Sequence, residues 1–258
     1  MKRTILPLCI GAFASAAIVF VALAQPESSY QPRIDKDGWE ILLDGKDLNA
    51  WNVDPDRDGW ALNEQGELHP TKGGPTIFTK QRYCDFVLEL DAKVAAGKKS
   101  NSGLFFRVHN PGDPVNTGME IQVLDDVSYG VNWDSMNANG ALYDLVHPSS
   151  SASSPPGEWD HFRLTVNDNL VTVELNGKEI VQADLDQWTT ANQNPNGSHN
   201  TFPHAIGSLP REGFLGLQNY GGVPVWFRNI RLKPLTDRKP QYTGKEPIAD
   251  VLRKPNAK

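Results

Sequence analysis

The sequence predicts an all-β domain in which two antiparallel sheets pack as a β-sandwich or jelly roll. Apolar residues recur at every second position in several short runs, as in strands with one buried and one exposed face. Gly, Pro, Asn and Asp separate these runs, and helical periodicity is confined to one short possible helix near residues 184–191. Many short strands separated by turn residues favour a sandwich or jelly roll over any helical fold.

The clearest strands lie in the middle of the chain. Residues 86–94 alternate strictly between apolar and polar side chains, and the same period recurs over residues 162–166 and 171–175. Asn167-Asp168-Asn169 joins the last two runs, and Asn176-Gly177 leads into residues 179–181. Because Asn, Asp and Gly tolerate positive φ, we expect a hairpin followed by a second tight turn.

Four segments carry polar side chains that an ordinary strand does not need. In the first, residues 101–109, a core face made by Leu104, Phe106 and Val108 leaves three side chains for the opposite face. These are Phe105, Arg107 and His109. The sequence therefore predicts Arg107 and His109 on a face that a ligand can reach.

The second segment, residues 119–125, buries Met119, Ile121 and Val123 and so presents Glu120 and Gln122 together on the other face. Strict alternation puts Asp125 on the core side. Its carboxylate can serve a site only if the strand ends or twists near it.

The remaining two segments are residues 213–222 and 140–144. Leu215 and Leu217 form the core set of the first, so Gly216 and Gln218 share the opposite face. A glycine there leaves room for a ligand or a neighbouring chain. The second supplies Tyr143 and a carboxylate after an Asn-rich loop.

Together the four segments offer Arg, Glu, Gln and Tyr side chains, with Trp133 and Trp226 available for stacking. Planar polar groups bind hydroxyls and aromatic faces bind the C–H side of a sugar ring, so a carbohydrate is the expected ligand. The competing interpretation is a solvent-facing sheet, in which alternate polar residues need no ligand.

Other chemistries find little support in the sequence. The histidines have no repeated ligand spacing, and the loop carboxylates that could hold calcium follow no recognisable pattern. No cofactor is expected, although a divalent metal stays open. No phosphate-binding loop or G-x-S-x-G motif occurs, and Cys84 beside an apolar strand predicts an inert thiol.

The first 24 residues predict a secretory signal peptide. Lys2 and Arg3 precede an apolar stretch that ends at the small-residue site Ala22-Leu23-Ala24. A retained membrane anchor and a lipid-modified Cys9 are the alternatives. Lys2 and Arg3 are the only charges removed by cleavage, so the net charge changes from −6 to −8. An acidic, secreted or periplasmic protein without nucleic acid as a partner is expected, and the sequence leaves its oligomeric state open.

The boundaries follow from composition. Residues 25–37 predict a polar leader, residues 38–235 the sandwich domain, and residues 236–258 a polar tail. Cleavage leaves 234 of the 258 residues, ample for one core, and Cys84 as the only cysteine, so no intramolecular disulfide can form.

The four segments, in this order, resemble the 3-keto-disaccharide hydrolase family of secreted bacterial domains. Further matching stretches are Gly38-Trp39-Glu40-Ile41-Leu42-Leu43-Asp44-Gly45-Lys46-Asp47-Leu48, Trp159-Asp160-His161-Phe162, Asn176-Gly177 and Val225-Trp226-Phe227-Arg228-Asn229-Ile230. The resemblance covers about residues 38–235 and implies a concanavalin-like jelly roll. Two departures are Asp160, where many members carry Asn, and Asn219-Tyr220, where many carry Asp-His.

The resemblance implies an enzyme that cleaves 3-keto-glycosides by elimination and hydration, giving net hydrolysis. On this hypothesis Glu120 is the base at C2, Arg107 stabilises the enolate, and Tyr143 or Asp125 protonates the leaving oxygen. Gln122, Gln218, His109, Trp133 and Asn219 complete the candidate substrate-binding set. The alternatives are a non-catalytic carbohydrate-binding module of the same fold and a structural envelope protein.

Overall fold

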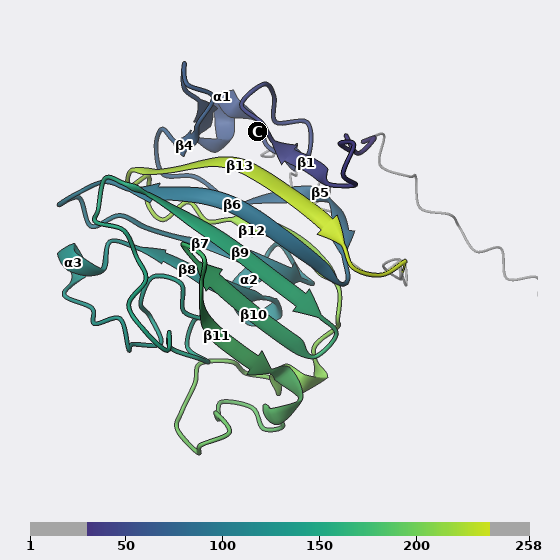
Figure 1. The fold of residues 1–258 in the computed structure, drawn as a ribbon, viewed down its shortest axis with the longest axis vertical. Coiled ribbons are helices and arrows are strands. Elements are labelled where there is room, and N and C mark those ends of the chain that lie inside the picture. Colours follow the sequence, from purple (N-terminus) through teal and green to yellow (C-terminus); the bar gives the residue numbers. More distant parts are fainter. Residues whose placement is uncertain (1–29, 238–258) are drawn as a thin grey trace, which may run out of the picture.

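The computed structural model describes residues 30–237 (Figure 1). The predicted signal peptide, the first five residues of the leader and most of the C-terminal tail lie outside these residues. In the described part of the chain no helix is long and apolar enough to cross a membrane. The elements are β1 (Glu40–Leu43), β2 (Trp51–Asn52), α1 (Pro55–Asp58), β3 (Trp60–Leu62), β4 (Leu68–Pro70), β5 (Ile77–Tyr83), β6 (Phe86–Val94), β7 (Asn101–Val108), α2 (Pro114–Thr117), β8 (Met119–Leu124), α3 (Asp126–Tyr129), β9 (Trp159–Asn167), β10 (Leu170–Leu175), β11 (Lys178–Asp184), η1 (Leu185–Gln187), η2 (Ile206–Ser208), β12 (Gly213–Leu217) and β13 (Val225–Pro234).

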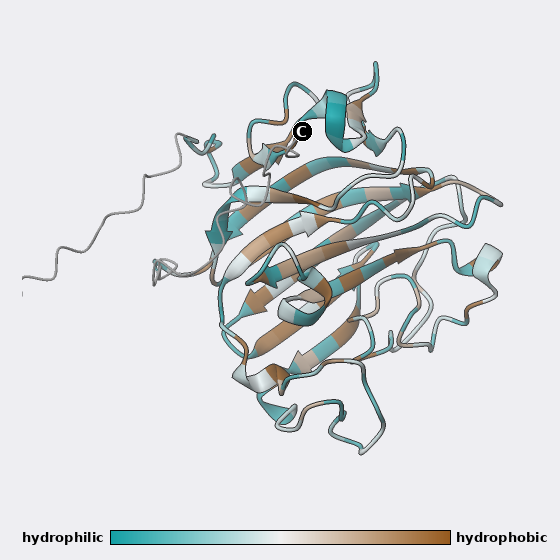
Figure 2. Cartoon of the chain, turned by 180° about the vertical axis from the view of Figure 1, so that it is seen from behind, coloured by the Kyte–Doolittle hydropathy of each residue, from teal (hydrophilic) through white to brown (hydrophobic). Residues whose placement is uncertain are grey.

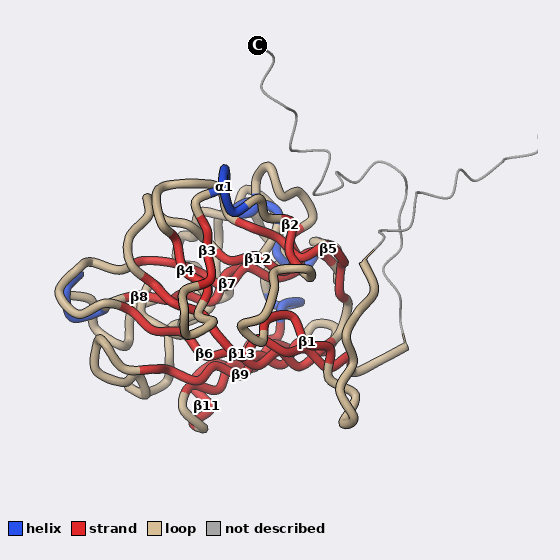
Figure 3. The backbone as a smooth tube through the Cα atoms, turned by 90° about the horizontal axis from the view of Figure 1, so that it is seen from above, coloured by secondary structure: helices blue, strands red, loops and turns tan. Residues whose placement is uncertain are grey.

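The strands form two antiparallel sheets, as the sequence predicts. The eight-stranded sheet has the order β11-β10-β9-β6-β13-β4-β3, with β1 also paired to β13. The five-stranded sheet has the order β2-β5-β12-β7-β8. Figure 3 shows them as two layers, with β5, β12 and β7 in one and β6, β13 and β9 in the other.

The main core lies between the two sheets. Alternate residues of β6, such as Leu88 and Leu90, face it and are 0% exposed. Leu104 of β7 and Ile121 of β8 enter the same core from the other sheet. Seen from behind, apolar and polar residues alternate along the strands, and α2 lies in front of the five-stranded sheet (Figure 2). The period-two pattern therefore predicted the buried side of most strands correctly.

The expected turns have the backbone geometry that their residues favour. β9 and β10 form a hairpin in which Leu170 pairs with Asn167, and Asp168 has φ 50°. Asn176 and Gly177, both at positive φ, connect β10 to β11. The helix expected near residues 184–191 is wrong: only the three-residue 3₁₀ turn η1 forms, and Trp188 packs into the core beside it.

A β-bulge in β7 changes the alternation predicted for residues 101–109. Phe214 pairs with Val108 and Gly216 with Phe105, so two residues of β7, Phe106 and Arg107, stand opposite one residue of β12. Arg107 adopts φ 49°, which turns the strand at that point. Val108 consequently joins Phe105 in a small apolar cluster outside the main core, and the face predicted for Arg107 is wrong.

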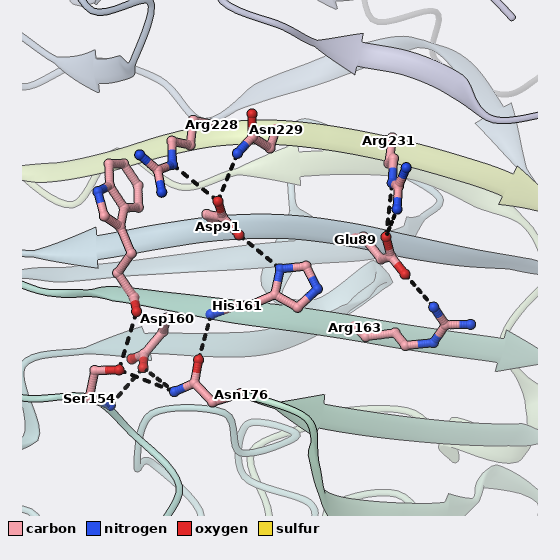
Figure 4. Close-up of polar contacts among 11 residues, drawn as sticks. Glu89, Asp91, Ser154, Asp160, His161, Arg163, Asn176, Arg228, Asn229 and Arg231 are labelled. Atoms are coloured by element: carbon pink, nitrogen blue, oxygen red, sulfur yellow. Dashed lines mark hydrogen bonds and ion pairs between the residues drawn. The ribbon is translucent and has the colours of Figure 1, made fainter. Parts of the chain in front are cut away.

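The outer face of the eight-stranded sheet is polar, and its charges pair with each other (Figure 4). Asp91 accepts hydrogen bonds from His161, Arg228 and Asn229, while Glu89 pairs with two arginines, Arg163 and Arg231. These contacts satisfy both carboxylates. This face fits the solvent-facing interpretation that the sequence left open.

Candidate active site

The predicted site residues that the fold brings near one another lie on the outer face of the five-stranded sheet. Two rows of residues cross its strands. Gly216 of β12 pairs with Phe105 of β7, which pairs with Glu120 of β8. In the next row the backbone N–H of Gln218 donates to the carbonyl of Gly103, which pairs with Gln122. Since Phe105 lies outside the main core, Glu120 and Gln122 project from the same side, as predicted.

Tyr143 extends the first row beyond the edge of the sheet. Leu142 forms a bridge with Ile121, and the backbone N–H of Tyr143 donates to the carbonyl of Glu120 at 2.9 Å. The loop of residues 125–141 returns to this position after α3. Partial burial, followed by the nearby charges of Glu120, Asp144 and Tyr220, raises the pKa of the Tyr143 phenol. That phenol is therefore a proton donor at neutral pH.

Glu120 has the most perturbed environment of these residues. Its side chain is 7% exposed, and no described Lys, Arg or His forms an ion pair with it. Burial alone raises the pKa of its carboxyl from 4.5 to about 8. A carboxyl with a pKa in this range can gain or lose a proton near neutral pH, where a general base or a general acid works best.

The carboxyl of Glu120 reaches this position by leaning across β7. An ideal Cβ on Gly103 would lie 1.8 Å from Glu120 Oε1, 2.5 Å from Cδ and 2.7 Å from Cγ. The outer half of the side chain therefore occupies the space that a larger residue at position 103 would fill.

Gln122 offers an acceptor beside this carboxyl. Its side chain is 4% exposed, and its Oε1 has no hydrogen-bond partner among the described residues. A buried amide oxygen without a partner costs about 1–3 kcal/mol. A ligand hydroxyl that donates to it would recover part of that cost.

Arg107 does not join this group, contrary to its expected place beside Glu120. It is 1% exposed; its guanidinium donates to the carbonyls of Cys84 and Asp168 and pairs with Asp85 at 3.0 Å. The bulge directs its side chain to the β5–β6 and β9–β10 turns. The enolate-stabilising role predicted for Arg107 thus has no geometric basis in this structure.

Asp125 is also used elsewhere. β8 ends at Leu124, and Asp125 caps α3, where Oδ1 accepts from the N–H of Ser128 at 3.1 Å. The residue is 0% exposed. The capping contact and the burial of Asp125 argue against an acid role, which stays a prediction.

The other three candidates lie around the site without converging on Glu120. Asn219 donates to the carbonyl of Lys72 at 2.9 Å and accepts from Gly222, so its side chain holds the loop that follows β12. His109 lies beside Arg82 at the other end of the sheet, and Trp133 is 44% exposed in the loop after α3. The structure gives Asn219 a supporting task and brings neither of the others to the carboxyl.

Two residues were missed by the sequence reasoning. Asn52 pairs with Phe78 in the row that contains Glu120, and its Oδ1 has no partner among the described residues. Trp51 is buried in the core, and because side chains alternate along a strand, its neighbour Asn52 faces outward. A tryptophan expected in the core could therefore have indicated Asn52 as a site residue. Tyr220 is 52% exposed just beyond Gln218, and its charge contributes to the shift at Tyr143. Only the closed fold brings Tyr220 to that position.

No group of three or more His, Cys, Asp or Glu side chains among residues 30–237 is arranged to hold a metal ion. The polar groups present are the carboxyl of Glu120, the amides of Gln122, Gln218 and Asn52, and the phenols of Tyr143 and Tyr220. These groups can exchange protons and bind hydroxyls, which is the chemistry expected for a carbohydrate ligand.

Comparison with known proteins gives consistent matches along the domain. Residues 38–233 match the family described as the 3-keto-alpha-glucoside-1,2-lyase-like domain. A curated 3-keto-disaccharide hydrolase from Bacteroides thetaiotaomicron is 29% identical over 241 residues, which cover 80% of this chain and 82% of that protein.

Solved structures agree in fold. A crystal structure of a protein proposed to be a glycosyl hydrolase, from Parabacteroides distasonis, has a TM-score of 0.68 and 32% identity, covering 76% of this chain and 99% of its own. A second such protein from the same organism has a TM-score of 0.60 and 26% identity, covering 78% of this chain and 95% of its own.

Proposed function

Because the chain belongs to the 3-keto-alpha-glucoside-1,2-lyase-like family, we propose that it is a carbohydrate-active enzyme that cleaves 3-keto-glycosides by elimination and hydration. The observation that carries the proposal is the buried carboxyl of Glu120, with its pKa raised to about 8, among Gln122, Tyr143 and Gln218 on one face of the sheet. On a sheet face that only contacts solvent, a carboxylate is normally exposed or paired with a cation. The burial of Glu120, with no cationic partner among the described residues, therefore favours a functional site.

The substrate decides which groups are needed. A ketone at C3 acidifies the hydrogen at C2, so a base removes that proton and the electron pair forms a C1–C2 double bond as the C1–O bond breaks. The leaving oxygen takes a proton and departs as an alcohol. Water then adds across the double bond, which gives the two products of net hydrolysis.

The residues present can divide this work. Glu120 is the base, since a carboxylate with a pKa near 8 accepts a proton more strongly than an ordinary one. Tyr143, a phenol kept protonated by its raised pKa, donates to the leaving oxygen. The amide N–H groups of Gln122 and Gln218 replace Arg107 as hydrogen-bond donors to the C3 oxygen, where negative charge grows.

The decisive experiment replaces Glu120 by Gln and measures release of reducing 3-keto sugar from a 3-keto-disaccharide. The expected result is a folded protein with turnover reduced at least about a hundredfold, since a general base contributes about 10²–10⁴. Glu179→Gln on β11, an exposed carboxylate, is the matched control and keeps full turnover. The assay is run with and without added divalent metal.

Binding without catalysis is the other outcome that this experiment can reveal. If the protein is a binding module, wild type and Glu120→Gln bind an oligosaccharide equally well and neither releases a reducing sugar. Unchanged turnover in Glu120→Gln would instead remove Glu120 from the chemistry.

Export is part of the proposal. It rests on the basic, apolar and small-residue order of residues 1–24. Fractionation of expressing cells tests it: the protein is expected in the periplasm or the medium, shortened at its N-terminus, and a full-length product in the cytoplasm would contradict export.

A further inference from the structure

Gly103 of β7 lies where the Glu120 side chain reaches that strand. Because glycine has no side chain, the Glu120 carboxyl can occupy the space beside it. In the pairing of β7 with β8, Gly103 stands opposite Gln122, while Glu120 stands opposite Phe105. Gly103 is therefore the diagonal neighbour of Glu120. Diagonal neighbours in an antiparallel pair are within reach of long side chains.

The side chain of Glu120 takes this diagonal. The three heavy atoms nearest to an ideal Cβ on Gly103 all belong to Glu120, at 1.8, 2.5 and 2.7 Å. Real Cβ atoms do not approach other atoms this closely, so Glu120 and a larger residue at position 103 cannot both keep their places. The glycine φ is not in the left-handed region, so backbone conformation does not require glycine here.

The space at Gly103 bears on how much water reaches the carboxyl. With its outer atoms in that space, Glu120 is 7% exposed. A side chain pushed outward from the sheet would gain contact with solvent. Since burial is the sole cause of its pKa shift, the position of the carboxyl and its proton affinity change together.

We infer that Gly103 is a positioning residue, whose missing side chain forms a notch that holds the Glu120 carboxyl against β7 and out of water. This inference rests on the proposed function, because it concerns the residue assigned there as the base. It adds the cause of the carboxyl's placement and identifies a second position that controls the reaction.

The test is Gly103→Ala, read first by a property that does not depend on turnover. The atoms that would meet the new methyl group are Cγ, Cδ and Oε1 of Glu120. All three move when the side chain rotates about its Cα–Cβ bond, so Glu120 can turn away and the variant is expected to fold. Its thermal midpoint and circular dichroism check this. Gly73→Ala is the matched control, because a Cβ there meets only ordinary contacts at 3.6 Å or more.

The carbon-13 signal of the Glu120 carboxyl, assigned with Glu120→Gln, is titrated in the ligand-free protein. The midpoint is expected near 8 in wild type and in Gly73→Ala, and at least one pH unit lower in Gly103→Ala. A midpoint unchanged by Gly103→Ala, or an ordinary midpoint in wild type, would overturn the inference.

Turnover separates this inference from the proposed function. In Gly103→Ala, kcat on a 3-keto-disaccharide is expected to fall at least tenfold with a smaller change in KM, and the pH dependence moves with the carbon-13 midpoint. If wild type shows no turnover while the midpoint still shifts, the proposed function fails and the positioning role of Gly103 stands.

Discussion

Replacing Glu120 by Gln tests the buried state of the carboxyl through stability as well as through activity. In the folded protein the pKa of this carboxyl is about 8, against 4.5 for an ordinary glutamate. Between these two values the folded state holds one proton more than the unfolded state. The free energy of unfolding of the wild type therefore falls as pH rises through this window, by about 1.4 kcal/mol per pH unit.

The structure sets the size of the effect. Below pH 4.5 the carboxyl is neutral in both states and contributes no slope. The cost accumulates to about 3 kcal/mol at pH 7 and about 5 kcal/mol above pH 8, the upper limit if the carboxyl stays buried when it ionises. Gln has the same shape and stays neutral, so Glu120→Gln lacks this slope.

Urea unfolding at pH 5, 7 and 9 measures the difference between the two proteins. We expect Glu120→Gln to become progressively more stable than the wild type as pH rises, while the exposed control Glu179→Gln follows the wild type throughout. A difference between Glu120→Gln and wild type that does not change with pH would refute a buried, neutral Glu120.

Three further predictions use the same protein. As a base, Glu120 gives a kcat/KM that rises about tenfold per pH unit up to about pH 8, whereas a profile that is flat up to about pH 8 and falls above it would make Glu120 the acid. Arg107→Met loses about 3–5 kcal/mol in urea unfolding, because the buried carboxylate of Asp85 loses its ion pair with the guanidinium and two carbonyls lose a hydrogen bond; unchanged stability would contradict the buried pairing. Gln122→Met lowers kcat/KM for a 3-keto-disaccharide about three- to tenfold through one lost hydrogen bond, and an unchanged kcat/KM would show that Gln122 does not contact the substrate.

Much of the candidate site follows from strand alternation alone. Glu120 and Gln122 share the outer face because β8 is regular from Met119 to Leu124, and Gln218 continues the phase of β12 by one residue. The family motifs in the sequence fall on these positions. Tyr143 was predicted from its motif, and the fold places it beside Glu120.

The departures from the predicted site have local causes. Arg107 left the predicted face because one bulge shifts the phase of every later residue in the strand. Asp125 follows the last residue of its strand, where a helix cap competes for the carboxylate. Asn219 binds a loop that is distant in sequence, and such long-range partners leave no periodic signal.

The sequence by itself determined the sheet class, the buried side of most strands and the placement of Glu120, Gln122 and Gln218, because side-chain direction in a regular strand depends only on neighbouring residues. Only the tertiary structure decided that the Glu120 carboxyl leans over Gly103, is buried with no cationic partner among the described residues, and has a raised pKa. The physical reason is that burial and electrostatic environment are set by strands and loops that meet across the fold, which no local pattern records.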